Sequence, residues 1–272
     1  MTGPRSMSMR IGALLGAGVI LGACAVVGTG TATGQPRVLL HMDFDGPAGS
    51  APDPIWRAEL GGGGWGNHEA QVYTDRPDNV SLDGHGHLAM TARRAADGQI
   101  TSARLTTWGN FAFTYGRAEA RIALPAGTGL HPAFWLLGTD IYEVGWPAAG
   151  EIDVIETLNH ATEWHSAVHA PQAGTARGQQ LSASGPVPFP LAGEFRTYWV
   201  ERTPGRIVTG VDDLTLLTIT PLNLQEGATW VFDRPFNLLF SLAVGGAWPG
   251  PVDASTPFPA SMLIDYVRVT EL

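Results

Sequence analysis

The sequence of 272 residues contains no lysine and a single cysteine, Cys24. No intramolecular disulfide can form, so the folded part must be stable through its hydrophobic core alone. Charged residues make up only 15% of the chain, and the formal net charge is −9. An acidic surface argues against nucleic acid or an anionic polysaccharide as a partner, because both carry negative charge. The composition therefore favours an uncharged partner.

Beyond the first 36 residues, the sequence also lacks any sustained apolar pattern of helical period. Short alternating segments separated by Gly, Pro, Asp and Asn dominate instead, and this spacing predicts an all-β sandwich or barrel. We expect a single domain over residues 37–272, with residues 171–186 as a polar surface loop. The expected strands are 38–44, 87–93, 111–124, 151–157, 195–202, 236–242 and 262–269.

Residues 1–36 resemble a targeting segment followed by a short linker. Arg5 and Arg10 precede an apolar run over residues 11–27, and no acidic residue occurs before Asp43. This arrangement predicts a secretory signal peptide, and the run is short and glycine-rich for a retained membrane anchor. Residues 21–24 (LGAC) resemble a bacterial lipobox, in which Cys24 would be lipidated; cleavage near residues 31–34 is the alternative. We expect export from a bacterial cell, either as a secreted protein or anchored to the outer face of the membrane through Cys24.

Three acidic residues, Glu151, Asp153 and Glu156, lie in the β-branched segment GEIDVIE at residues 150–156. Side chains of a strand alternate between faces, so Glu151 and Asp153 share a face and Glu156 is out of phase by one residue. A β-bulge between Asp153 and Glu156 would return Glu156 to that face. Repulsion among the three would raise the pKa of at least one carboxyl group and leave another ionised. A proton donor beside a carboxylate nucleophile is the pairing that glycoside hydrolysis requires.

The same acidic segment has two other interpretations: a solvated strand edge that discourages aggregation, or a site for a hard cation.

Two further predicted strands carry charged residues, and in each the alternation of side chains decides which residues share one face of the strand. Arg117, Glu119 and Arg121 share one strand face and are expected to pair across strands. Asp265 is expected to share a face with apolar Leu263, Val267 and Val269, where a carboxylate needs an arginine partner or a metal ion.

Around the acidic strand, the sequence motifs resemble those of glycoside hydrolase family 16, and within it those of the bacterial laminarinases. The two motifs that carry the resemblance most strongly are HPAFWLLG (131–138) and GWPAAGEIDVIE (145–156). The remaining motifs, in order along the chain, are WGNHE (65–69), YTDRPDNV (73–80), TSARLTT (101–107), FTYGR (113–117), AVGGAWPG (243–250) and LIDYVRV (263–269).

The resemblance implies a jelly roll of two curved antiparallel sheets with a sugar-binding cleft on the concave face. It also implies a retaining endo-β-1,3-glucanase, expected to be a monomer that acts on neutral β-glucan and needs no cofactor for catalysis. In this family pattern Glu151 is the nucleophile, Glu156 the general acid/base and Asp153 the helper between them. The extra residue before Glu156 is typical of the laminarinase branch.

The resemblance also assigns residues to sugar binding and to a metal. Flat aromatic rings cover the apolar faces of sugars while polar groups fix their orientation. The implied sugar-binding residues are Trp135, Trp146, Trp248, Asn67, Arg104 and His169, although each tryptophan could instead pack in the core and His169 could be a hydrogen-bonded strand residue. Asp265, with carbonyls near residues 43–46, matches a structural calcium site of the family.

The sequence departs from the family pattern at several positions. His131 stands where a tryptophan is usual, and Ala247 replaces the usual asparagine before Trp248, so affinity or glucan preference is expected to differ. Arg202 replaces a tryptophan after Glu201, a change that concerns stability rather than activity. Related proteins of this fold leave three alternatives open: a non-catalytic β-glucan-binding protein, a transglycosylase and a mixed-linkage β-1,3-1,4-glucanase.

Overall fold

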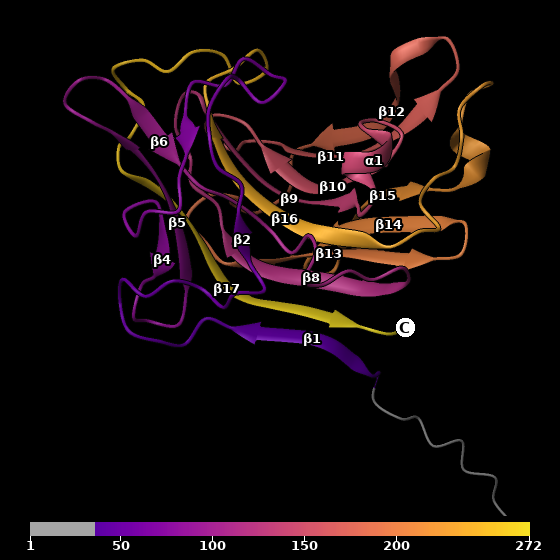
Figure 1. The fold of residues 1–272 in the computed structure, drawn as a ribbon, viewed down its shortest axis with the longest axis horizontal. Helices are drawn as coiled ribbons and strands as arrows, with labels where there is room; N and C mark the ends of the chain where they lie inside the picture. The colour runs from indigo at the N-terminus through magenta and orange to yellow at the C-terminus, as the bar shows by residue number, and fades with distance from the viewer. Residues whose placement is uncertain (1–35) are drawn as a thin grey trace, which may run out of the picture. The chain divides into compact units, whose positions relative to one another are not determined.

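A computed structural model describes residues 36–272, which form two β-sheets packed face to face (Figure 1). Cys24 and the signal peptide predicted for residues 1–36 lie outside this part of the chain, apart from Pro36. Among residues 36–272, no helix has the length and apolar character needed to cross a membrane. The predicted all-β sandwich of two sheets is confirmed.

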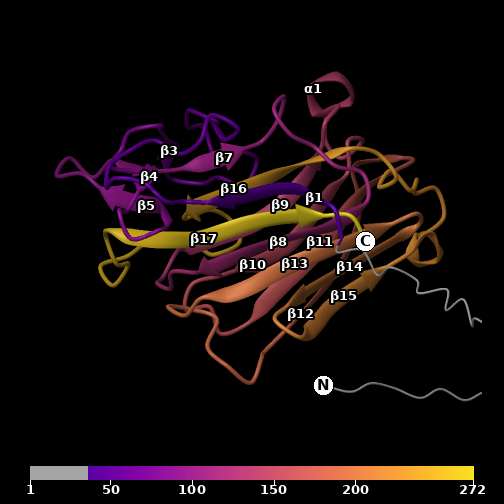
Figure 2. The same cartoon turned by 90° about the horizontal axis from the view of Figure 1, so that it is seen from below.

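The larger sheet has ten strands in the order β15-β14-β13-β8-β17-β5-β6-β3, with β1 paired to β17 and β4 paired to β5 (Figure 2). Every pairing in it is antiparallel except β3 with β6. Its strands are β1 (Val38–Asp43), β3 (Val72–Tyr73), β4 (Val80–Leu82), β5 (Leu88–Arg94), β6 (Ile100–Ser102), β8 (Gly116–Ala123), β13 (Arg196–Thr203), β14 (Arg206–Val211), β15 (Leu214–Ile219) and β17 (Ala260–Thr270).

The smaller sheet has seven antiparallel strands in the order β12-β11-β10-β9-β16-β7-β2. A short helix, α1 (Ile141–Val144), connects β9 to β10, and a 3₁₀ turn (Pro221–Asn223) follows β15. The strands are β2 (Arg57–Ala58), β7 (Arg104–Thr106), β9 (Leu130–Gly138), β10 (Glu151–Thr157), β11 (Trp164–Gln172), β12 (Thr175–Gly185) and β16 (Phe236–Val244).

The hydrophobic core lies between the two sheets and follows from the alternation of side chains along their strands. Ala118, Ala120 and Ile122 of β8 are fully buried on one face, as the sequence predicts. From the smaller sheet, Ile152 and Val154 of β10 enter the same core. One face of each sheet is thereby used for packing, which leaves the opposite face of β10 for its carboxylates.

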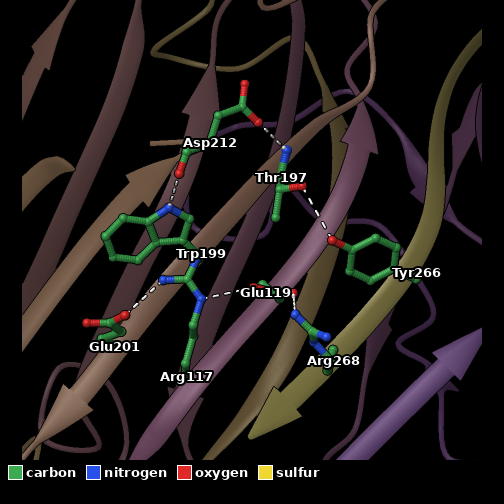
Figure 3. Close-up of polar contacts among 8 residues, drawn as sticks. All are labelled: Arg117, Glu119, Thr197, Trp199, Glu201, Asp212, Tyr266 and Arg268. Carbon is green, nitrogen blue, oxygen red and sulfur yellow. Dashed lines mark hydrogen bonds and ion pairs between the residues drawn. The ribbon is translucent and has the colours of Figure 1, made fainter. Parts of the chain in front are cut away.

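The outer face of the ten-stranded sheet carries the predicted cross-strand ion pairs (Figure 3). Arg117 donates to Glu201 at 2.8 Å and to Glu119 at 2.9 Å, and Glu119 also accepts from Arg268 at 2.6 Å. The guanidinium of Arg117 also covers the ring of Trp199 at 4.3 Å. The charges of this face are therefore matched within it, which confirms their structural role.

The prediction of a surface loop at residues 171–186 is wrong. Most of this segment is β12, which pairs along its length with β11. Because β12 is the edge strand of its sheet, its side chains are mostly exposed or partly exposed on both faces. A polar edge strand gives no alternation of apolar and polar residues, so the sequence resembles a loop.

The predicted face of Asp265 is also wrong. The pairing of β17 with β8 shifts register between Ile264 and Tyr266, so the buried side chains after the shift are Val267 and Val269 while Asp265 is partly exposed. Its carboxylate pairs with Arg121 at 2.5 Å. The arginine partner, one of the two possibilities open from the sequence, is the one that the structure contains.

Arg202 is fully buried in β13, and no carboxylate of residues 36–272 is in hydrogen-bond contact with it. Its guanidinium donates to the backbone oxygens of Phe113, Phe232 and Arg234 at 2.9, 2.5 and 2.8 Å. It also lies over the ring of Phe236 at 4.3 Å. The flat guanidinium thus stacks as an aromatic ring would and satisfies three carbonyls besides.

Replacing Arg202 with alanine should therefore destabilise the fold. The variant R202A leaves three carbonyl groups without their donor and a cavity beside Phe236, so the free energy of unfolding should fall by about 3 kcal/mol. Urea denaturation followed by tryptophan fluorescence measures this change. The matched control is R206A, because Arg206 is exposed on the neighbouring strand; equal stability of R202A and R206A would contradict the assignment.

Candidate functional site

A bulge in β10 brings the three acidic side chains to one face. The pairing with β11 shifts register between Asp153 and Glu156, and the pairing with β9 shifts between Asp153 and Ile155. Val154 and Ile155 are both fully buried, so two consecutive side chains enter the core. This confirms the bulge that the phase of Glu156 predicts. The side chains of Glu151, Asp153 and Glu156 are 19%, 6% and 14% exposed.

His169 on β11 lies opposite Glu151 and compensates the first two acids. Its Nε2 is 3.2 Å from Asp153 Oδ2 and 3.6 Å from Glu151 Oε1. Burial alone would lower the pKa of His169, but the hydrogen bond to Asp153 and the charges of Asp153 and Glu151 raise it to about 9. The ring is therefore an imidazolium at neutral pH and supplies a positive charge to the acidic strand.

The two carboxyl groups nearest His169 hold protons more tightly than free carboxyl groups. Burial raises the pKa of Glu151 to about 8, with a further increase from the charge of Asp153. Burial also raises the pKa of Asp153, with a further increase from Glu156, to about 6. Glu151 and Asp153 therefore form a pair that retains a proton near neutral pH, as the repulsion argument predicts.

These groups also form the one set within residues 36–272 that has the composition of a metal site. Ligand atoms of Glu151, Asp153 and His169 lie within 4.8 Å of one another. Because His169 is held as a cation by Asp153 and Glu151, the positive charge that these carboxylates need is already present. A metal ion would have to displace the proton from His169, so the donor set fits a charge-balanced cluster better.

Glu156 has a different partner, His131 on the neighbouring strand β9. His131 Nε2 lies 2.8 Å from Glu156 Oε1, with 11% and 14% of the two side chains exposed. Burial lowers the pKa of His131, but the hydrogen bond to Glu156 and the charges of Glu156, Glu69 and Asp153 outweigh burial and raise it. The sequence marks His131 only as a departure from the family pattern, so this contact was not predicted.

Arg104 lies between two indole rings on the same sheet face. Its guanidinium carbon is 4.6 Å from the ring centres of both Trp65 and Trp135, and its Nε donates to Glu59. Trp135 is therefore only 8% exposed. The structure places Arg104 and Trp135 against each other beside Asp153, to which Trp135 is paired in register. The sequence did not predict Trp65 or Glu59 as site residues. Trp65 is the first residue of the family motif WGNHE, and that motif was the signal that could have identified it.

Two exposed tryptophans flank the acidic strand. Trp146 is 45% exposed and its ring lies 5.6 Å from that of His169. Trp248 is 44% exposed and its ring meets those of His131 and His165 edge-on at 5.2 and 4.9 Å. Both indoles offer accessible apolar surface within reach of the carboxylates, as a sugar platform requires.

Asn67 is partly buried beside the loop that carries Trp248. Its backbone oxygen accepts from the Ala247 N–H at 2.8 Å. A cavity of about 320 Å³ adjoins this contact and is lined by His68, Ala70, Gly245, Gly246, Ala247, Pro251 and Val252. The small side chain of Ala247 therefore opens onto free space next to Asn67.

Comparisons with known proteins agree with this arrangement. A sequence model described as "Glycosyl hydrolases family 16" matches residues 67–268. The chain is 37% identical to a beta-glucanase of Rhodothermus marinus over 264 residues, which cover 92% of this chain and 91% of that protein. The laminarinase catalytic domain of Thermotoga maritima MSB8 superimposes with a TM-score of 0.78 at 36% identity, covering 87% of this chain and 98% of that structure. The laminarinase of Rhodothermus marinus superimposes with a TM-score of 0.77 at 37% identity, covering 87% and 98%.

The charge on His169 should contribute to stability in a pH-dependent way. A pKa raised from 6.5 to about 9 means that the protonated ring stabilises the folded chain fully below pH 6.5 and loses this effect as pH rises through 9. H169Q should therefore lower the free energy of unfolding by on the order of 2 kcal/mol at pH 7. Its deficit should shrink by pH 10.

Urea denaturation of the native protein and H169Q at both pH values measures the difference. H160Q is the control, because His160 is exposed in the turn between β10 and β11. A deficit for H169Q that is as large at pH 10 as at pH 7 would show that the charge has no part in it.

Proposed function

Because the chain belongs to the glycosyl hydrolases of family 16, we propose that it is a retaining endo-β-1,3-glucanase that cleaves neutral glucan of the laminarin type. The single observation that carries this proposal is the position of Glu151 and Glu156 on one face of β10, separated by the bulge after Asp153. The relatives named above as laminarinases support the choice of β-1,3 linkages.

The proposed reaction uses the carboxyl groups in two steps. In the first step, Glu151 attacks the anomeric carbon while Glu156 protonates the departing oxygen, which gives a glycosyl-enzyme intermediate. In the second step, Glu156 deprotonates a water molecule that releases the sugar with its configuration retained. Such a mechanism works with carboxyl groups about 5–5.5 Å apart.

Asp153 and His169 would adjust the charge of the nucleophile. The carboxyl pair of Glu151 and Asp153 holds one proton near neutral pH, and attack by Glu151 requires that this proton lies on Asp153. The imidazolium of His169 lies 3.2 Å from Asp153 and 3.6 Å from Glu151, and its charge lowers the pKa of both carboxyl groups. No metal is needed for either step.

The exposed indoles of Trp146 and Trp248 would hold the glucan against this face. Sugar rings present apolar C–H surfaces that stack on aromatic rings, and an uncharged polymer is not repelled by the acidic strand. Asn67 and Arg104 are proposed to donate hydrogen bonds to sugar hydroxyls. Ala247 and the adjoining cavity leave room near Trp248, which favours testing mixed-linkage glucan as a second substrate.

The proposal predicts that both glutamates are required for turnover. E151Q and E156Q should each lower kcat on laminarin by about a thousand-fold or more, because each step then lacks its nucleophile or its proton donor. Reducing-sugar release measures turnover, and NMR of the first product should detect the β-anomer. E226Q is the matched control, since Glu226 is exposed in a turn between β15 and β16 and not on the strands that carry the carboxylates.

Three outcomes would contradict the proposal. Substantial turnover by E151Q would remove the nucleophile assignment, and an α-anomeric first product would exclude retention. Binding of laminarin without any cleavage by the native protein would identify a glucan-binding protein instead.

A second experiment, product analysis on laminarin, lichenan, agarose and xyloglucan, determines which linkage is cleaved. Transfer of the glycosyl intermediate to a sugar rather than to water would identify a transglycosylase.

A structural calcium ion at Asp265 stays a prediction. The N-terminal segment does approach this residue, because Asp43 pairs with Tyr266 in register. However, the Asp265 carboxylate is in contact with Arg121 at 2.5 Å, and a cation would have to displace that guanidinium. The residues therefore fit an ion pair better than a calcium site, and no part of the mechanism depends on one.

We also propose that the protein is exported and acts as a monomer, either free or anchored through Cys24. Mass spectrometry of the N-terminus after expression in a bacterial host tests the anchor. A diacylglyceryl mass on Cys24 is expected for the anchored form, and an unmodified N-terminus downstream of Cys24 would exclude it.

A further inference from the structure

His131 is in hydrogen-bond contact with the carboxyl group that the proposed reaction uses twice for proton transfer. The distance from His131 Nε2 to Glu156 Oε1 is 2.8 Å, and both side chains are largely buried. A carboxyl group that must donate a proton in one step and accept it in the next is sensitive to any neighbour that can also carry that proton.

Among the described residues, the imidazole of His131 has one hydrogen-bond partner, Glu156. The other ring nitrogen, Nδ1, is buried and has no hydrogen-bond partner among residues 36–272. The ring of Trp248 meets that of His131 edge-on at 5.2 Å, and the residue opposite on β16 is Ala243. Glu156 is therefore the protein group with which His131 can exchange a proton.

The charges that face His131 come from several elements. Glu156 and Asp153 of β10 and Glu69 of the loop before β3 favour the imidazolium, and burial opposes it. His165 of β11 lies on the other side of Glu156, and its pKa is lowered, first by burial and also by the charge of His131. The pKa of His131 is thus higher than that of His165, so His131 is the ring that binds a proton more tightly near Glu156.

We propose that His131 is a positioning residue that shares one proton with Glu156 and thereby sets the alkaline limit of glycoside cleavage. The inference rests on the proposed function, in which Glu156 is the general acid/base. In the form that cleaves the substrate, the pair carries a single proton, which is shared between the imidazole and the carboxyl group across the hydrogen bond.

In the first step, the shared proton passes to the departing sugar oxygen. Glu151 forms a bond to the anomeric carbon, and the electron pair of the breaking C–O bond passes to the departing oxygen. A proton from Glu156 goes to that oxygen, and the proton on His131 Nε2 moves to Glu156 when the pair begins as imidazolium and carboxylate. In the second step, the oxygen of a water molecule forms a bond to the anomeric carbon, its proton passes to the pair through Glu156, and the electron pair of the breaking Glu151–sugar bond returns to Glu151.

The sign of the pH effect is fixed by this sharing. When neither group is protonated, a proton can bind to His131 or to Glu156. The pair therefore binds one proton at least as tightly as Glu156 would if its neighbour were a hydrogen-bond donor that cannot take up a proton. The pair therefore keeps the proton needed for cleavage to a higher pH. Removing the basic ring nitrogen should move the alkaline limb of activity to lower pH.

The test compares native protein and H131Q over the pH range 5–10, because glutamine can still donate to Glu156 but cannot hold the proton. The alkaline limb of kcat/KM on laminarin should move down by about one pH unit in H131Q. With 2,4-dinitrophenyl β-laminaribioside, whose leaving group departs without protonation, native and H131Q kcat/KM should agree within about two-fold. H160Q controls for the loss of an exposed imidazole and should keep the native limb on both substrates.

An unchanged alkaline limb in H131Q would overturn the inference, and so would equal losses on both substrates, which indicate a purely structural role. If H131Q does not fold, NMR titration of the imidazole in native protein and E156Q decides: the pKa of His131 should fall in E156Q, and no fall overturns the inference. A native protein that fails to cleave laminarin would instead refute the proposed function, so the two failures are distinguishable.

Discussion

Repulsion among three carboxyl groups on one strand face is the constraint around which this molecule is arranged. The bulge in β10 brings Glu151, Asp153 and Glu156 to the same side, where burial and mutual repulsion disfavour the ionised forms of Glu151 and Asp153. The neighbouring strands relieve this constraint with one imidazole each: His169 from β11 and His131 from β9. The reactive face is therefore an assembly of three adjacent strands, and its chemistry cannot be attributed to β10 alone.

The rest of the sandwich holds those three strands in register. Residues that alternate with the acids, such as Ile152 and Val154, are fully buried against the larger sheet. A slip of one residue along β10 would turn the carboxylates into this core, so the packing and the reactive geometry depend on the same pattern. The buried guanidinium of Arg202 supports the same arrangement from the other layer, since it ties β13 to backbone oxygens at Phe113 and near β16.

Sequence reasoning predicted the features that depend on local periodicity. The sandwich, the buried face of β8, the cross-strand charges around Arg117 and the bulge before Glu156 follow from alternation and its one interruption. It did not predict β12, because an edge strand needs no apolar face, or the orientation of Asp265, because a register shift in β17 leaves no mark in composition. The contact between His131 and Glu156 joins residues far apart in the chain, so only the strand order reveals it.

The two faces that lie outside the core respond differently to alkali. On the outer face of the ten-stranded sheet every cation in the described network is an arginine, as at Arg117 and Arg268, and a guanidinium keeps its charge far above neutral pH. On the acidic face the cations are imidazoles, which become neutral much earlier. A mildly alkaline solution therefore removes the positive charges from the acidic face, while the arginines of the outer network keep theirs. Inactivation by alkali should for this reason begin as a titration of the folded protein, and the same loss of charge on His169 also lowers its free energy of unfolding.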